Sequence, residues 1–252
     1  MLRDGALSEQ VAAEVTVGLN AFMSRDDEHP DLCVSIGGDG TMLASVNKYT
    51  DQLDRVVFVG LHTGTLGFFT DYQMQEVDTM IEDIRNNPEP PVEEREMLKI
   101  EYKHQTWYAL NEVRVENNRH SQVIDVEIDG EYFEAFHGNG LCISTSSGST
   151  GYNKSVGGAV MAPGAKLMQI AEITPINHNA FRSLASPLVV KDKSVITLKT
   201  NNFEHTVMCM DSRSFEMRDS EKITVQIAQD RTARFASYRH VSFLERLQRA
   251  FL

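Results

Sequence analysis

A glycine-rich segment near the start of the chain combines residue types that could bind a phosphate and accept a proton. Residues 37–41 read Gly-Gly-Asp-Gly-Thr and follow a short apolar run. Glycines let backbone N–H groups approach an anion closely, and a helix beginning here would add the positive end of its dipole. The carboxylate of Asp39 opposes an anion unless it accepts a proton or binds a metal. The segment therefore indicates phosphate chemistry, with a plain strand-to-helix turn as the alternative.

Three further segments carry glycines or polar side chains suited to a ligand. They are Thr63-Gly64-Thr65-Leu66-Gly67-Phe68, Asn111-Glu112, and Gly148-Ser149-Thr150-Gly151-Tyr152 followed by Gly157-Gly158. The side chains of neighbouring residues on a strand point to opposite faces. Those of Asn111 and Glu112 should therefore do so unless a bulge or a strand end intervenes. Taken alone, a polar pair at a strand edge and a packed tyrosine are the simpler interpretations.

The elements that must position these segments fall into two groups. The first part of the chain alternates helices and strands, as a parallel sheet requires. We expect a helix over 11–23, a strand over 32–36, a helix over 41–49, a strand over 56–61 and a helix over 73–86. No strand precedes the first helix in this pattern, so the first parallel strand is either missing or formed by residues that the pattern does not identify.

After Pro88, Pro90 and Pro91 the pattern changes to short strands. Residues 123–136 predict a hairpin, because Asp129-Gly130 supplies the positive φ angles of a two-residue turn. Other strands are expected at 98–102, 108–115, 188–190, 195–199, 206–210, 223–227 and 233–237, and an amphipathic helix at the C-terminus. We predict an α/β domain with a Rossmann-like parallel sheet over 1–92, a β-rich domain of sandwich type over 93–238, and a helix within 239–252 that returns to the first domain.

The Gly-Gly-Asp-Gly-Thr segment resembles a kinase superfamily that includes NAD kinases, diacylglycerol and sphingosine kinases and, more distantly, phosphofructokinases. The remaining motifs, in this order and spacing, resemble those of bacterial-type NAD kinases from about Leu32 to Leu188. The resemblance implies transfer of a phosphoryl group from ATP, or from another donor such as polyphosphate, to the adenosine 2′-hydroxyl of NAD. It also implies Mg²⁺ bound through substrate phosphates and a homotetramer. The acidic composition and the three scattered cysteines, for their part, favour a cytoplasmic location.

The resemblance further implies a role for each matching residue. Asp39 would be the general base, and the donor phosphates would lie on Gly37, Gly38, Gly40 and Thr41. The dinucleotide would be held by Asn111, Glu112, His137, Asn139, Thr150, Gly151, Tyr152, Ser155 and Thr174. Asn111 would contact the adenine side, Glu112 the ribose hydroxyls, and Thr174 the pocket of a neighbouring subunit. No metal site made of side chains is expected.

Three positions depart from the family pattern near the expected nicotinamide pocket. Asn139 stands where the family has an aspartate that holds the nicotinamide amide, and asparagine offers one acceptor and adds a donor. Ser146 and Gly151 replace a common proline and alanine, which loosens the backbone. We expect a looser nicotinamide pocket with the phosphoryl transfer retained.

The composition of the chain argues against two classes of protein, those that bind nucleic acids and those that span membranes. The 252 residues carry 24 Lys and Arg against 36 Asp and Glu, a net charge of −12, which argues against a nucleic-acid-binding protein. We expect no membrane span, because no apolar run reaches about 18 residues. The cysteines Cys33, Cys142 and Cys209 are expected to be reduced and mostly buried. Besides a kinase acting on NAD, the sequence leaves open a dinucleotide-binding regulator without turnover and a lipid kinase of the same superfamily.

Overall fold

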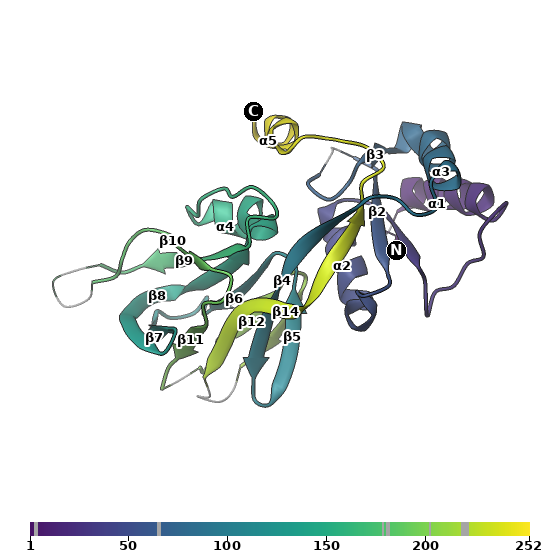
Figure 1. Cartoon of the computed structure of the whole chain (residues 1–252). Coiled ribbons are helices and arrows are strands. Elements are labelled where there is room, and N and C mark those ends of the chain that lie inside the picture. Colours follow the sequence, from purple (N-terminus) through teal and green to yellow (C-terminus); the bar gives the residue numbers. More distant parts are fainter. Residues whose placement is uncertain (3–4, 65–66, 178, 180–181, 202, 218–221) are drawn as a thin grey trace. The chain divides into compact units, whose positions relative to one another are not determined.

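The structure is a computed structural model that describes residues 1–2, 5–64, 67–177, 179, 182–201, 203–217 and 222–252. Contacts divide the chain into two compact units (Figure 1). The first, called the N-terminal unit below, comprises residues 1–95 and 232–252, and the second, the strand-rich unit, comprises residues 96–231. Within the glycine motif at 63–68, Thr65 and Leu66 lie outside the described residues.

The N-terminal unit is built around parallel strands. Its elements are α1 (Ala6–Leu19), β1 (Leu32–Ile36), α2 (Asp39–Lys48), β2 (Val57–His62), β3 (Tyr72–Gln73) and α3 (Val77–Asn86), with 3₁₀ turns at Thr50–Gln52 and Met74–Glu76. β1 and β3 run parallel to β2, as does the end of β14 (Ile223–Ala236) through Arg234 and Phe235. The predicted order of helices and strands is confirmed. α2 begins earlier than predicted, because the carbonyl of Gly38 accepts the first hydrogen bonds of the helix.

The edge of β1 is partly covered by the first residues of the chain. The N–H of Ile36 donates to the carbonyl of Met1 at 2.9 Å, and the amino group of Met1 donates to the carbonyl of Val34 at 3.0 Å. Leu2 and Ile36 form an isolated parallel bridge. The strand that the sequence pattern did not identify is therefore represented by a short pairing that precedes α1.

The strand-rich unit is arranged around one long strand, β8 (Glu131–Thr145). β7 (Gln122–Ile128) and β6 (Glu112–Glu116) pair with successive parts of one edge of β8, and β9 (Leu167–Pro175) pairs with the other edge. The remaining elements are β4 (Val92–Tyr102), β5 (Gln105–Ala109), a 3₁₀ turn (Ser147–Thr150), α4 (Tyr152–Ser155), β10 (Leu188–Lys191), β11 (Ile196–Lys199), β12 (Val207–Met210) and β13 (Arg213–Glu216). The chain is thus a mixed α/β fold followed by a strand-rich region, as predicted.

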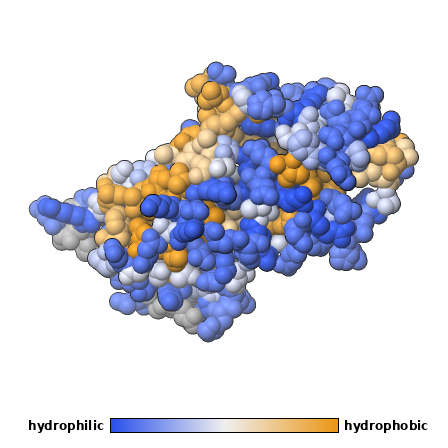
Figure 2. All heavy atoms as spheres, viewed as in Figure 1, coloured by the Kyte–Doolittle hydropathy of each residue, from blue (hydrophilic) through white to orange (hydrophobic). Residues whose placement is uncertain are grey.

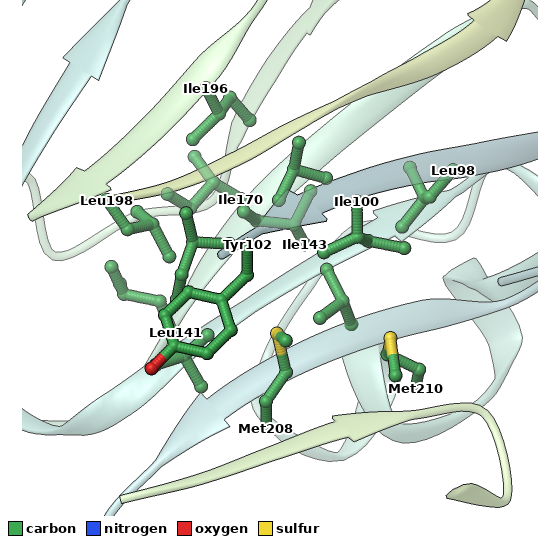
Figure 3. Close-up of a cluster of buried hydrophobic side chains, with 14 of the residues drawn as sticks. Leu98, Ile100, Tyr102, Leu141, Ile143, Ile170, Ile196, Leu198, Met208 and Met210 are labelled. Carbon is green, nitrogen blue, oxygen red and sulfur yellow. The ribbon is translucent and has the colours of Figure 1, made fainter. Parts of the chain in front are cut away.

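The core of the strand-rich unit is formed by apolar side chains from several strands (Figure 3). Side chains of β4 meet those of β8, β9, β11 and β12, represented by Leu98, Ile100, Leu141, Ile143, Ile170, Ile196, Leu198, Met208 and Met210. The predicted hairpin is confirmed, with Asp129 at φ 55° and Gly130 at φ 83°. β9 was not predicted from the sequence, because most of its residues are buried on both faces and the alternation typical of a half-exposed strand is absent.

Among the residues that the structure describes, no helix is long and apolar enough to cross a membrane. All three cysteines are free and buried, as the sequence predicts.

Candidate functional site

The Gly-Gly-Asp-Gly-Thr segment joins β1 to α2 in the N-terminal unit. Gly37 has φ 154°, and its N–H donates to the carbonyl of Leu61 at 2.9 Å, which holds the segment against the end of β2. Gly38 immediately precedes α2, whose first turn contains Asp39 and Gly40. The first N–H groups of a helix have no partners within the helix and carry its positive dipole end. This end of the parallel strands can therefore receive an anion, as the sequence indicates.

The carboxylate of Asp39 is held by the second glycine motif. Its Oδ2 accepts the N–H of Phe68 at 2.9 Å, and its Oδ1 accepts the N–H of Phe69 at 3.0 Å. A Cβ atom at Gly67 would overlap the carboxylate, so a side chain there would displace it. Each carboxylate oxygen has two lone-pair positions, so one on each oxygen remains available for a substrate proton. The two motifs, whose contacting residues lie 29 and 30 positions apart in the sequence, thus meet at one side chain.

The C-terminal helix α5 (Phe243–Phe251) contacts the same loop. The guanidinium of Arg246 donates to the carbonyls of Gly67 at 3.2 Å and Thr70 at 2.7 Å, and it pairs with the carboxylate of Asp71. The Arg246 side chain is only 11% exposed. The return of the C-terminal helix to the first domain is confirmed, and Arg246 is a contact that sequence patterns did not reveal.

In the strand-rich unit, Asn111 and Glu112 lie at a break between two strands. The predicted continuous strand over 108–115 is wrong, because β5 ends at Ala109 and β6 begins at Glu112. A Cβ atom placed on Gly151 would lie 3.4 Å from both the Asn111 Nδ2 and the Glu112 Oε2. The two side chains therefore converge on one place, and Gly151 leaves room there for about one methyl group.

The 3₁₀ turn at 147–150 packs directly on this pair. A Cβ atom on Gly148 would overlap the carbonyl of Asn111. The hydroxyl of Thr145 donates to the carbonyl of Leu110 at 2.6 Å and accepts the N–H of Gly148 at 3.1 Å. The structure therefore brings together the polar pair and the glycine turn that the sequence identified separately.

Two acceptor atoms of the pair are buried without a donor. Asn111 and Glu112 are 8% and 7% exposed, and the Oδ1 of Asn111 and the Oε2 of Glu112 have no hydrogen-bond partner among the described residues. Such atoms cost free energy unless a ligand supplies donors. The pKa of Glu112 is raised to about 7, mainly by burial and also by the negative charge of Asp211, while the positive charge of Arg114 opposes both effects. The pair can accept hydrogen bonds from a ligand most strongly when Glu112 is ionised.

Tyr152 is the first residue of α4, and its side chain packs on residues of β6. Its ring lies 4.0 Å from the guanidinium carbon of Arg114, and its hydroxyl is 3.4 Å from the Oε2 of Glu116. Arg114 also donates to both carboxylate oxygens of Glu116, at 2.9 and 3.0 Å. Arg114 and Glu116 were not identified from the sequence, although their alternation along a strand places them on one face.

A second group of predicted residues lies at the other end of β6. The Asn139 Nδ2 donates to the carbonyl of Asn117 at 2.9 Å, a bond that an aspartate could not make. His137 lies 3.3 Å from the hydroxyl of Ser121 through its Nε2. Thr174 is exposed, has φ 49° and lies on β9 beside this part of β8.

The remaining predicted residues lie around the 3₁₀ turn and α4. Thr150 is half-buried, and Ser155 is exposed at the end of α4. Ser146, which was expected to loosen the backbone, donates its hydroxyl to the buried carboxylate of Glu96 at 3.1 Å. Among the described residues, no group of three His, Cys, Asp or Glu side chains is placed to hold a metal ion.

Both parts of the chain match models of known protein domains. The model of the ATP-NAD kinase N-terminal domain matches residues 6–89, and that of the ATP-NAD kinase C-terminal domain matches residues 110–237. The chain is 39% identical over 258 residues to the NAD kinase of Latilactobacillus sakei, covering 99% of this chain and 95% of the relative. It is 37% identical over 252 residues to NAD kinase 1 of Bacillus subtilis, covering 98% and 94%.

Solved structures agree on the fold. Yeast NADH kinase in complex with NADH superposes with a TM-score of 0.76 at 22% identity, covering 87% of this chain and 65% of that one. An NAD kinase from Archaeoglobus fulgidus in complex with ATP gives a TM-score of 0.75 at 22% identity, covering 98% and 94%. With both domain models matched and full-length relatives near 40% identity, the chain belongs to the NAD kinase family.

Proposed function

We propose that the chain phosphorylates the adenosine 2′-hydroxyl of NAD, with ATP or another donor such as polyphosphate, and so forms NADP. The observation that carries the proposal is the pair of buried acceptors without donors, Asn111 Oδ1 and Glu112 Oε2. Ribose hydroxyls and the adenine amino group are donors of the kind that these acceptors lack. Family membership, shown over both units, identifies the reaction class.

Asp39 is the residue that we assign as general base. The bond from the 2′-oxygen to the γ-phosphorus forms as the bond from that phosphorus to the bridging oxygen of ADP breaks, and Asp39 accepts the hydroxyl proton. Its two bonds to N–H groups of Phe68 and Phe69 fix the carboxylate without consuming every lone pair. In a loose phosphoryl transfer the protein contributes mostly positioning and charge stabilisation, so a carboxylate held in place suffices.

The donor phosphates would lie against Gly37, Gly38, Gly40 and Thr41 at the start of α2. Mg²⁺ arriving on those phosphates would supply charge neutralisation during the transfer. The donor set of the chain fits an ion that arrives on a nucleotide, because Mg²⁺ keeps several phosphate and water ligands and asks little of the protein. The protein's own part is to orient the phosphates through backbone N–H groups at the helix terminus.

We assign the nicotinamide end of NAD to the second group of residues. In the pairing of β6 with β8, Glu112 lies opposite Ser144 and Glu116 opposite Gly140. At about 3.3 Å per residue, Asn139 is roughly 17 Å along β8 from Ser144. This length suits an extended dinucleotide with adenosine at Asn111, Glu112, Thr150 and Gly151, and nicotinamide near Tyr152, Ser155, His137, Asn139 and Thr174.

We further infer a homo-oligomer, a tetramer by family resemblance, in the cytoplasm. Several large apolar side chains of the strand-rich unit are exposed, and Figure 2 shows apolar residues gathered on part of the surface. The exposed large apolar side chains of this unit include Val123, Phe133, Val160, Ile176, Leu184 and Val189. Exposed apolar surface of this kind is typical of protein interfaces. Three free thiols fit a reducing compartment.

The test is formation of NADP from NAD, ATP and Mg²⁺, followed by coupling to an NADP-dependent dehydrogenase. Asp39→Asn should lower kcat by about 10²- to 10⁴-fold with little change in KM for NAD. Asp78→Asn is a matched control, since Asp78 is exposed in the first turn of α3, and it should leave kcat unchanged. Full activity in Asp39→Asn would refute the base assignment. Binding of NADP by the unmodified chain without its formation would instead support a regulator.

A further inference from the structure

A carboxylate that is not among the residues predicted from the sequence, Asp211, holds the backbone of Asn111 and Glu112. Asp211 lies in the two-residue turn between β12 and β13, where Met210 pairs with Arg213. Its Oδ2 accepts the N–H of Leu110 at 2.8 Å. Its Oδ1 accepts the N–H of Asn111 at 2.8 Å and that of Glu112 at 3.3 Å.

The backbone of Asp211 completes the contact. Its own N–H donates to the carbonyl of Glu112 at 3.1 Å, so the two segments bind each other in both directions. Asp211 has φ 51°, in the left-handed region that aspartate tolerates better than most residues. That conformation turns the β12–β13 connection and presents the carboxylate to the segment at 110–112.

Three successive N–H groups that converge on one anion cannot all take part in a strand ladder. This convergence explains why β5 stops at Ala109 and why β6 restarts at Glu112. In a continuous strand the side chains of Asn111 and Glu112 would point to opposite faces. At the break, both approach the same position beside Gly151.

We propose that Asp211 is a positioning residue of the dinucleotide site: by gathering the N–H groups of residues 110–112, its carboxylate directs the Asn111 and Glu112 side chains to one ligand. The inference rests on the proposed function, because it assigns Asp211 a part in NAD binding. Asp211 acts through these two residues and makes no contact with the reacting atoms.

Asp211 also acts on Glu112 through its charge. The titratable or charged groups around Glu112 are Asp211 from the β12–β13 turn, Arg114 on β6, Cys142 on β8 and Cys209 on β12. Burial raises the pKa of both thiols, so they stay neutral near pH 7. Asp211 is therefore the negative charge that raises the pKa of Glu112, and its removal should lower that pKa.

The experiment compares Asp211→Asn and Asp211→Ala in the full chain with the matched control Asp129→Asn. Asp129 has the same place in the β7–β8 turn, with φ 55°, and accepts the Val195 N–H at 2.8 Å and the Ser194 hydroxyl at 3.1 Å. Asp211→Ala should raise KM for NAD by about tenfold or more, and Asp211→Asn by less, because an asparagine oxygen retains part of the contact. KM for ATP in both Asp211 variants should stay near that of the unmodified chain. KM for NAD in the control Asp129→Asn should also stay near the unmodified value.

The pH profile separates positioning from stability. KM for NAD in the unmodified chain should fall as pH rises through about 7, where Glu112 ionises. In Asp211→Asn the midpoint should move to lower pH, whereas loss of stability alone would leave the midpoint in place.

The inference would be overturned if Asp211→Asn changed neither KM for NAD nor the midpoint of its pH dependence. This result would be decisive even if Asp211→Ala did not fold. An equal rise of KM in Asp129→Asn would overturn it too, because the effect would then be common to turn aspartates. NADP formation by the unmodified chain is measured before any variant is compared. If the unmodified chain forms no NADP, the proposed function itself is refuted.

Discussion

At the scale of single residues, Glu112, which we propose to bind the ribose of NAD, carries a cost in stability. Its carboxylate is buried, close to Asp211, and has an unpartnered Oε2. A carboxyl group with a raised pKa in the folded state destabilises the fold where it must ionise. Residues placed for function commonly carry such a cost, and stabilising them removes function.

Glu112→Gln should therefore stabilise the chain at alkaline pH. Below pH 4.5 Glu112 is protonated in the folded and unfolded states, and between 4.5 and about 7 only the folded state keeps the proton. Stability from this group is thus lost as pH rises through that window, by up to about 3 kcal/mol. Chemical denaturation should show Glu112→Gln more stable than the unmodified chain at pH 8 and equal to it near pH 4.5, with KM for NAD raised.

Glu131→Gln provides the control, since Glu131 is an exposed glutamate in the same unit. This variant, which removes an exposed carboxylate, should not reproduce the gain in stability expected of Glu112→Gln at pH 8. If Glu112→Gln were less stable at pH 8 than the unmodified chain, the conclusion that ionised Glu112 strains the fold would be wrong.

At the scale of elements, α5 contacts the loop at residues 67–71, and the same loop binds the carboxylate of Asp39. Arg246 binds two loop carbonyls and Asp71, while the N–H groups of Phe68 and Phe69 face the Asp39 carboxylate. The ring of Phe68 also lies 5.7 Å from that of Phe251, between centroids. The helix therefore orders a backbone segment whose other side holds Asp39, the carboxylate that we propose as the general base.

Arg246→Met should lower kcat by about tenfold and the free energy of unfolding by about 2 kcal/mol, because it removes the donor to the part-buried bonds at the Gly67 and Thr70 carbonyls. KM for NAD should change little, since Asn111 and Glu112 belong to the other unit. Arg249→Met is the comparison on the same helix, because Arg249 is exposed and pairs only with Glu245 among the described contacts. Equal losses in both variants would show that the helix acts only through general stability.

Sequence patterns predicted most elements but not the break at Leu110 and Asn111. The apolar alternation over 108–115 is that of a single strand, and the group that interrupts it, Asp211, lies 100 residues farther along the chain. The pattern of neighbouring residues carries no information about a partner so distant in the sequence. The motif residues were predictable because their types are chemically unusual, whereas Arg114, Glu116 and Arg246 are ordinary charged residues until the fold places them.

At the scale of the whole molecule, a net charge of −12 meets substrates that are themselves anions. Long-range repulsion slows the approach of an anion, and salt shortens the range of that repulsion. Raising NaCl from about 20 to 150 mM at constant free Mg²⁺ should therefore raise kcat/KM for NAD, by roughly two- to fivefold. Sucrose at equal osmolality should have no such effect. A steady fall of kcat/KM with salt would show that local positive side chains dominate the field felt by NAD.

The three buried thiols have a consequence for chemical labelling of the molecule. Cys33, Cys142 and Cys209 are each at most 9% exposed, and burial raises the pKa of all three. Maleimides and alkylating reagents attack accessible thiolates, which these residues supply poorly at neutral pH. A single cysteine introduced on the surface would thus take up nearly all of a fluorophore or spin label, with the native cysteines left in place.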